Sequence, residues 1–158
     1  MINIDATTPQ LRATKTLLDG YFSRAVGNIE PLISKNFKYQ SYPKVIDHPD
    51  ETKMEHIQNW GPMFASFSSA EPTIHEVIEA PGKVVVHALT QSRVQLTAVW
   101  SAPDGTTVDY DSLSILSFVE EDGKLKVFDM KDFTDPEKRS AYHTAAGKAL
   151  AGKGALVA

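Results

Sequence analysis

The chain has 158 residues, of which 42% are hydrophobic and 23% charged, a composition typical of globular proteins and not of disordered or fibrous ones. It contains no cysteine, which excludes disulfides, thiolate metal sites and cysteine nucleophiles, and its length suffices to bury a core without them. Because this length is near the usual size of one domain, we expect a single domain over residues 1–158. The net charge is −4 and no cluster of lysine or arginine occurs, so we expect no nucleic-acid partner.

The sequence shows no signal for export or membrane insertion. Residues 1–6 include Asp5 and lack the basic and apolar regions of a secretory signal. No apolar stretch has the length of a transmembrane helix. We therefore expect a cytoplasmic protein without a membrane partner.

The first half of the sequence predicts three helices and one short strand. Apolar residues recur at helical spacing over residues 8–25, where Thr8 can cap the first turn. A short second helix is predicted over 28–33. Residues 37–42 alternate and are aromatic, which is typical of a strand. Apolar side chains at helical spacing over 57–67 then predict a third helix with one apolar face.

The second half of the sequence changes to the alternating pattern of β-strands. Turns containing glycine with proline or aspartate separate four predicted strands, at 73–80, 84–100, 107–119 and 125–133. Residues 136–158 are rich in alanine, glycine and lysine and predict only a weak helix, so the core is expected over about 8–135. Helices followed by antiparallel strands predict an α+β fold, with three N-terminal helices packed on one face of a curved, mainly antiparallel sheet.

Four segments of the sequence resemble a group of fungal SnoaL-like proteins, which have the nuclear transport factor two-like fold. Their sequences are HEVIEA at 75–80, ILSF at 115–118, EDGKL at 121–125 and KDFTD at 131–135. The resemblance spans roughly residues 11–135. It implies a cone-shaped α+β barrel that surrounds one apolar pocket and pairs as a homodimer.

The resemblance also implies a function. Members of this group include isomerases, cyclases and dehydratases that act without a cofactor on polyketide, terpenoid or alkaloid intermediates of secondary metabolism. The resemblance therefore implies acid/base chemistry on a small apolar substrate. The wider superfamily contains non-catalytic modules that bind hydrophobic ligands or dimerise, and a fold alone does not decide between these functions.

Asp132 is the first candidate for catalysis, because the resembled enzymes place a carboxyl that faces the pocket at this position. Their usual residue is glutamate, one methylene longer. Burial in an apolar cone raises the pKa of a carboxyl toward the working range of a general acid or base. The alternative is a carboxylate at the rim of the cone, paired with Lys131 or another lysine.

The partner of Asp132 depends on the turn at 122–123. A two-residue loop would place Asp132 opposite Leu113 and diagonal to Asp111. A three-residue loop with a bulge would place it opposite Ser112 instead. Because a shift of one residue exchanges the faces of a strand, only one of these sets can share the pocket with Asp132.

We predict the bulged turn, because the resemblance places tyrosine and hydroxyl groups toward the pocket. In this arrangement Tyr110 and Ser114 flank Ser112 on the face of Asp132. Tyr110 can then donate a hydrogen bond to a carbonyl or to a developing oxyanion. The alternative for Tyr110 is a packing role on the strand.

The remaining candidates for substrate binding lie on the predicted helices and the first strand. Trp60 and Phe64 are on the apolar face of the third helix, and His56 can act there as an acid or base. Tyr21 and Tyr39 can line the pocket or belong to the edge of the core. The five histidines of the sequence include no pair at the helical spacing of metal ligands, so we expect neither a metal nor a cofactor.

Overall fold

The computed structural model describes residues 2–44, 49–81 and 90–155, which form helices on one face of a curved sheet. In chain order the elements are α1 (Pro9–Phe22), the 3-10 turns η1 (Val26–Asn28) and η2 (Glu30–Leu32), β1 (Ile33–Tyr42), β2 (Glu51–Thr52), α2 (Lys53–Ser66), β3 (Ser69–Pro81), β4 (Thr90–Ser101), β5 (Thr107–Glu121), β6 (Lys124–Thr134) and α3 (Pro136–Ala155). The strand order is β2-β1-β6-β5-β4-β3. β1 and β6 are parallel and the other neighbours are antiparallel.

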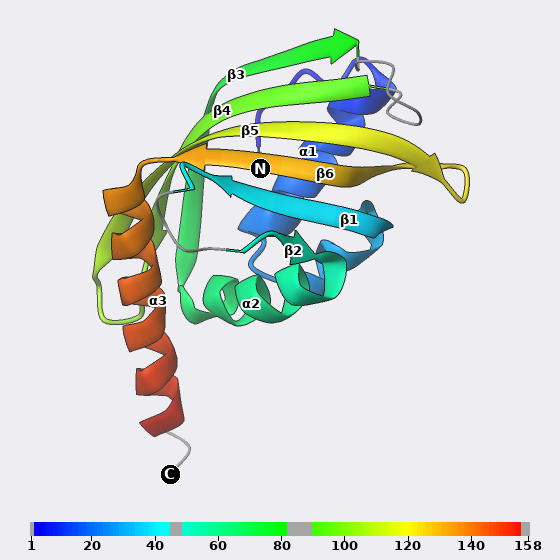
Figure 1. The fold of residues 1–158 in the computed structure, drawn as a ribbon. Helices are drawn as coiled ribbons and strands as arrows, with labels where there is room; N and C mark the ends of the chain where they lie inside the picture. The colour runs from blue at the N-terminus through cyan, green and yellow to red at the C-terminus, as the bar shows by residue number, and fades with distance from the viewer. Residues whose placement is uncertain (1, 45–48, 82–89, 156–158) are drawn as a thin grey trace.

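Figure 1 shows how the helices cover this sheet. α1 and α2 lie on the same face, while α3 continues from the end of β6 and contacts β5 and α2. The arrangement confirms the predicted α+β fold with a curved, mainly antiparallel sheet. Within the described ranges, no helix is both long enough and apolar enough to cross a lipid bilayer.

The first predicted helix is shorter than expected. Thr8 caps α1 by accepting a hydrogen bond from the backbone of Leu11, but the helix ends at Phe22. The reason is that Arg24 adopts a left-handed backbone conformation, with a φ of 62°, which a helix cannot continue through.

The predicted second helix is wrong, because the segment forms the two 3-10 turns η1 and η2 and then enters β1. Pro31 restricts the backbone in η2, and Ile33 is fully buried and pairs with Val127 of β6. The first strand therefore begins at Ile33, four residues before the predicted start. β2, with only two residues, had no recognisable sequence pattern.

The helix after the sheet packs more closely than its sequence suggested. α3 has 20 residues, and the side chains of Arg139, Tyr142 and Ala146 on it are buried. Small alanines let the helix approach α2 and β5, so that its two large side chains reach the interior. The packed part of the chain consequently continues beyond residue 135.

The four strands predicted for the second half of the sequence correspond in order to β3, β4, β5 and β6. β3 is longer than predicted at its start, and β4 is described from Thr90. The predicted strand at 84–100 therefore lies partly outside the described residues, at 84–89, as does Gly82 of the turn before it. His48 and His87 also lie outside them.

Candidate active site

A pocket opens between the helices and the inner face of the sheet. It has an empty volume of about 560 Å³, counting the solvent space at its mouth. Its wall is mostly aromatic and aliphatic, with a few polar groups. The lining residues are Leu18, Tyr21, Phe22, Tyr39, His56, Trp60, Phe64, Leu96, Trp100, Tyr110, Ser112, Ser114, Met130, Asp132 and Tyr142. All nine side chains selected from the sequence are among them, and the catalytic and binding roles given to them stay predictions.

The turn between β5 and β6 differs from the prediction. Glu121 pairs with Lys124, so the connection at 122–123 is a two-residue loop. Asp122 and Gly123 both have positive φ, 56° and 72°, as a type I′ turn requires. The three-residue bulged turn is therefore wrong, since this dipeptide meets the conformational demand of the shorter loop.

A bulge elsewhere in the hairpin restores the face that was expected. β6 has one extra residue, Phe128, between the partners of Phe118 and Ser117. Beyond the bulge Asp132 lies opposite Ser114. The predicted partner of Asp132 was Ser112, which is two residues from Ser114, and a shift of two residues leaves the faces of a strand unchanged. Asp132 therefore shares its face with Ser114 and not with Asp111. Asp111 instead pairs with Lys138, away from the pocket.

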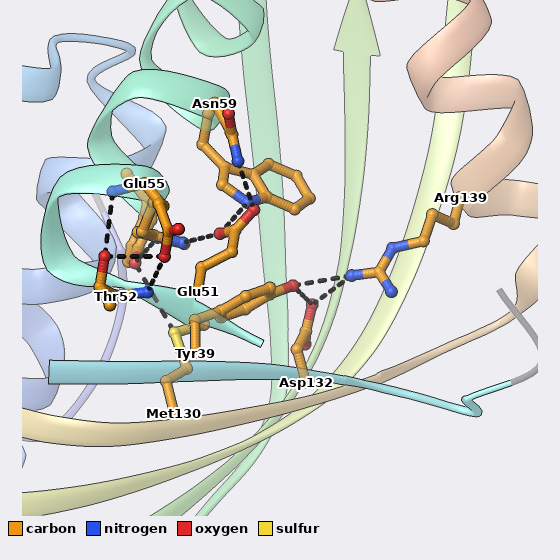
Figure 2. A network of polar contacts seen from close by, with 11 residues as sticks. Tyr39, Glu51, Thr52, Glu55, Asn59, Met130, Asp132 and Arg139 are labelled. Carbon is orange, nitrogen blue, oxygen red and sulfur yellow. Dashed lines mark hydrogen bonds and ion pairs between the residues drawn. The ribbon is translucent and has the colours of Figure 1, made fainter. Parts of the chain in front are cut away.

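Three hydroxyl groups converge on the Asp132 carboxyl. Figure 2 shows one of them, that of Tyr39, together with Arg139. Ser114 Oγ donates to Oδ1 at 2.9 Å, and the hydroxyls of Tyr110 and Tyr39 donate to Oδ2 at 3.1 and 3.4 Å. Arg139 Nη2 donates to the Tyr39 hydroxyl at 2.7 Å and lies 3.9 Å from Oδ2. We call these five residues the Asp132 cluster. It joins β1, β5, β6 and α3.

Burial controls the electrostatics of this cluster. Asp132 is 5% exposed, and removal from water raises the pKa of its carboxyl, although Arg139 and the hydroxyl donors oppose that rise. Burial and the charge of Asp132 also raise the pKa of Tyr110. Tyr110 therefore stays a neutral hydrogen-bond donor, while the carboxyl can hold a proton nearer to neutral pH than an ordinary aspartate.

A second cluster surrounds Glu51 on the side of α2 (Figure 2). His56 Nδ1 and Trp60 Nε1 donate to Glu51 Oε2 at 2.9 and 3.0 Å. Asn59 Nδ2 donates to Oε1 at 2.9 Å. A hydrogen bond of 2.8 Å joins His56 Nε2 to the hydroxyl of Tyr21 on α1. We call these five residues the Glu51 cluster.

The start of α2 positions the Glu51 cluster. Thr52 caps the helix in a reciprocal pair with Glu55, which sets the direction in which the chain leaves β2. His56 and Trp60 are four residues apart and therefore lie on the same helix face, directed toward Glu51. A short strand and one capped turn thus build most of the cluster locally.

Sequence reasoning missed three polar residues near the pocket. Glu51 comes just before a helix on which two side chains point into the molecule. This position is only a weak signal that the carboxyl of Glu51 is buried as well. Arg139 and Tyr142 are spaced three apart on one face of α3, but the apolar residues near them in the sequence are all alanines, which give only a weak signal of an inward face. Only packing shows that this face is internal.

The described histidines do not form a metal site. His75 is exposed and bonds Thr97 at 3.0 Å, while the ring of His143 lies 5.6 Å from that of Trp60. In the part of the chain that the structure describes, no three histidine, aspartate or glutamate side chains are gathered as a metal ion would require. The polar groups of the pocket are suited to proton transfer and hydrogen bonding.

Comparisons with known proteins identify the fold. No model of a protein family matches the sequence, and no curated protein does. Among solved structures, BvnE pinacolase from Penicillium brevicompactum is 11% identical, with a TM-score of 0.69 over 87% of this chain and 94% of that one. AusH from Aspergillus nidulans is 16% identical, with a TM-score of 0.65 over 80% and 83% of the two chains. The chain has the SnoaL-like fold.

A third similar structure widens the range of chemistry found on the SnoaL-like fold. The hexachlorocyclohexane dehydrochlorinase LinA, type 2, is 9% identical, with a TM-score of 0.61 over 80% of this chain and 83% of that one. At such identities the likeness shows the fold alone. The activity of this chain must therefore be argued from its own pocket.

Proposed function

We propose that this protein is a cofactor-independent acid/base enzyme that acts on a small apolar molecule carrying a carbonyl oxygen. Asp132 removes or returns a proton on carbon, and Tyr110 donates a hydrogen bond to the oxygen that gains charge. The observation that carries this proposal is the convergence of three hydroxyls on a buried carboxyl with a raised pKa.

The mobility of hydroxyl hydrogens makes this convergence useful for catalysis. The hydrogen of Tyr110 can turn about its C–O bond from Asp132 toward a substrate oxygen, with no movement of the ring. Asp132 keeps Ser114 as a donor while this happens. The carboxyl and the phenol then act on one substrate from adjacent positions.

The wall of the pocket favours an apolar cyclic substrate. Trp60 and Phe64 stack on each other, and Trp100 stacks on Phe64, with ring centroids 5.7 Å apart in both pairs. These features support an isomerase, cyclase or dehydratase that acts on a polyketide, terpenoid or alkaloid intermediate of secondary metabolism. The enzyme names of two similar structures, a pinacolase and a dehydrochlorinase, add support.

The alternative function is a non-catalytic module that holds a hydrophobic ligand or only dimerises. Such a module needs no polar groups directed at one point of its pocket, and burial of a carboxyl without use costs stability. The Asp132 cluster therefore favours catalysis over storage.

The expected homodimer and cytoplasmic location stay predictions. The outer face of the sheet exposes Val99, Leu113 and Phe133, a patch that favours pairing of two copies. Analytical ultracentrifugation of the wild type and of Leu113→Lys tests the dimer. We expect the substitution to shift the protein toward the monomer.

Deuterium exchange tests the proposed chemistry with simple ketones. We would incubate the chain in D₂O with a panel of small cyclic ketones, beginning with 3-cyclohexen-1-one, and follow exchange at the carbon between carbonyl and alkene by NMR. We expect exchange above the buffer rate, with a loss of about 100-fold or more in Asp132→Asn. The carboxylate takes the carbon-bound proton, and its electron pair moves into the enolate.

Asp111→Asn is the matched control for this experiment, because it makes the same chemical change on the opposite face of the neighbouring strand. It should exchange like the wild type. Equal rates in Asp132→Asn and the wild type would remove Asp132 from the mechanism. A wild type that exchanges no ketone of the panel faster than buffer overturns the proposed function.

A further inference from the structure

The Glu51 cluster has the geometry of a proton relay that ends in the pocket. The bond from His56 Nδ1 to Glu51 places a hydrogen on Nδ1, which leaves Nε2 to exchange a proton with the Tyr21 hydroxyl. When His56 is neutral, Tyr21 donates to Nε2; when it is protonated, the donation reverses. The charge on the imidazole thus sets whether Tyr21 can accept or deliver a proton.

Glu51 holds the imidazole more firmly than a single contact would. Its two oxygens also accept the N–H groups of Trp60 and Asn59, which belong to the same helix as His56. Glu51 and His56 are each 2% exposed, so water does not compete for these bonds. The relay is therefore fixed in one orientation.

The relay and Asp132 face the same pocket from different walls. His56 and Tyr21 belong to the helices, and Asp132 belongs to the sheet. Tyr39 lies between the two sets: its ring centroid is 4.7 Å from that of His56, while its hydroxyl bonds Asp132. Figure 2 shows this ring extending from β1 toward Asp132, with Glu51 on the α2 side.

We propose that Tyr21 and His56 form a second proton-transfer centre, which serves a different carbon of the substrate from the one that Asp132 serves. The inference rests on the proposed function and names a reaction class for it. A substrate held between the two walls loses a proton at one carbon and gains one at another. The class that fits is a β,γ-unsaturated ketone that becomes its conjugated isomer.

The proposed reaction is balanced without any co-reactant. The cycle begins with His56 protonated on both ring nitrogens. Asp132 takes a proton from the carbon between carbonyl and alkene, and the electron pair of the broken C–H bond forms a dienolate. The far alkene carbon then takes the hydroxyl proton of Tyr21, and the Nε2 proton of His56 replaces it. Asp132 ends protonated and His56 neutral, and exchange with solvent restores both. Glu51 touches no substrate and is a positioning residue.

The two steps can be measured separately in one reaction. With 3-cyclohexen-1-one in D₂O, exchange at carbon 2 of the recovered ketone reports proton removal, and formation of 2-cyclohexen-1-one reports proton delivery to carbon 4. We expect His56→Gln and Tyr21→Phe to lower the ratio of product to exchange by about 100-fold. Without a proton donor on the helix side of the pocket, the dienolate takes its proton back at carbon 2.

Two substitutions on the outside of the molecule serve as controls. His75→Gln and Tyr42→Phe make the same chemical changes at an exposed side chain and at a ring stacked on Phe133. Both should leave the ratio unchanged. If Asp132→Asn loses exchange but the two relay variants keep the wild-type ratio, the relay is refuted and the proposed function stands. If Asp132→Asn keeps exchange, or the wild type neither exchanges nor isomerises the ketone, the proposed function fails and this inference fails with it.

A measurement on the unsubstituted chain decides the role of the relay without risk to folding. We would titrate phenol, a compact enol analogue, into ¹⁵N-histidine-labelled protein and follow the His56 ring nitrogens. We expect Nε2 to shift on binding while Nδ1 keeps its hydrogen. An unchanged Nε2 at saturating phenol overturns the inference.

The positioning role of Glu51 has its own readout. Glu51→Gln should allow the other tautomer of His56, visible in the same spectrum, and should lower the product-to-exchange ratio. Glu51→Asp keeps the charge and should recover part of that ratio. An unchanged tautomer in Glu51→Gln contradicts this role.

Discussion

The two polar clusters of the pocket are built in opposite ways. In the Asp132 cluster, Tyr39 lies 93 residues from Asp132 and 100 from Arg139 in the sequence. In the Glu51 cluster, His56 is only five residues from Glu51. One cluster is thus assembled by tertiary packing and the other by the start of a helix.

The donors of the two clusters differ as well. Asp132 accepts from hydroxyls, whose hydrogens can turn toward a substrate, while Glu51 accepts from ring and amide N–H groups with fixed directions. Asp132 is therefore suited to exchange partners during a reaction. Glu51 is suited to hold one orientation. A pocket that moves protons needs both a mobile and a fixed set of hydrogen bonds.

The largest expected effect comes from the long-range cluster. Arg139→Met removes the buried cation that faces Asp132 and should lower the free energy of unfolding by about 3 kcal/mol. Urea denaturation at neutral pH measures the loss. Lys138→Met, the neighbouring cation at the surface, is the control and should cost much less. Equal losses would show that the long-range contact to Asp132 contributes little.

The local cluster should lose less stability when its centre is removed. Glu51→Ala leaves the N–H donors of His56, Trp60 and Asn59 without their carboxylate and should cost about 2 kcal/mol. Thermal or urea unfolding measures this, with the exposed Glu71→Ala as the matched control. If the two substitutions cost the same, the N–H groups have found other partners and the cluster is less rigid than its contacts suggest.

The smallest effect is a dependence of stability on pH. Burial raises the pKa of Asp132 in the folded state, so the folded chain binds more protons than the unfolded chain between the ordinary pKa, about 3.9, and the raised one. This contribution to stability is present at low pH and declines as pH rises across that window. Asp132→Asn lacks it, so its stability relative to the wild type should rise there, by at most about 1.4 kcal/mol per pH unit.

Glu121 supplies a control with the opposite sign. Hydrogen bonds from Ser34 and Lys126 lower its pKa to about 2. Its contribution is present above the ordinary glutamate pKa and is lost as pH falls toward 2. Unfolding curves of Asp132→Asn and Glu121→Gln over a series of pH values should therefore diverge from the wild type at opposite ends of the acidic range. If the difference in unfolding free energy between Asp132→Asn and the wild type does not change with pH, the Asp132 carboxyl of the wild type is not desolvated.

Much of the fold could be predicted because its signals are local. Helical spacing identified α1 and α2, and alternation with glycine turns identified the antiparallel strands. Trp60 and Phe64 followed from the apolar face of α2. The 3-10 turns and β2 could not be predicted, because segments of two or three residues contain too little pattern to distinguish them from a loop.

The candidate site was predictable only in part. The face shared by Asp132 and Ser114 was expected from a bulged turn, whereas the structure has a two-residue turn and a bulge at Phe128. The face agrees with the prediction and the turn does not. A bulge inside a hairpin depends on how side chains pack across two strands and against the helices, which no local pattern reports.

The sequence by itself determined the order of α1, β1, α2 and β3 to β6 and, away from the bulge in β6, which residues of each strand share a face, because both follow from periods of 3.6 and 2 along the chain. Only the tertiary structure decided the register beyond the bulge, the pairing of β2 with β1, and the packing of α3 that brings Arg139 to Tyr39 and Asp132. These outcomes depend on contacts between residues far apart in the sequence. Their free energies are set by burial and complementary packing of the whole cone, so they exist only once it has formed.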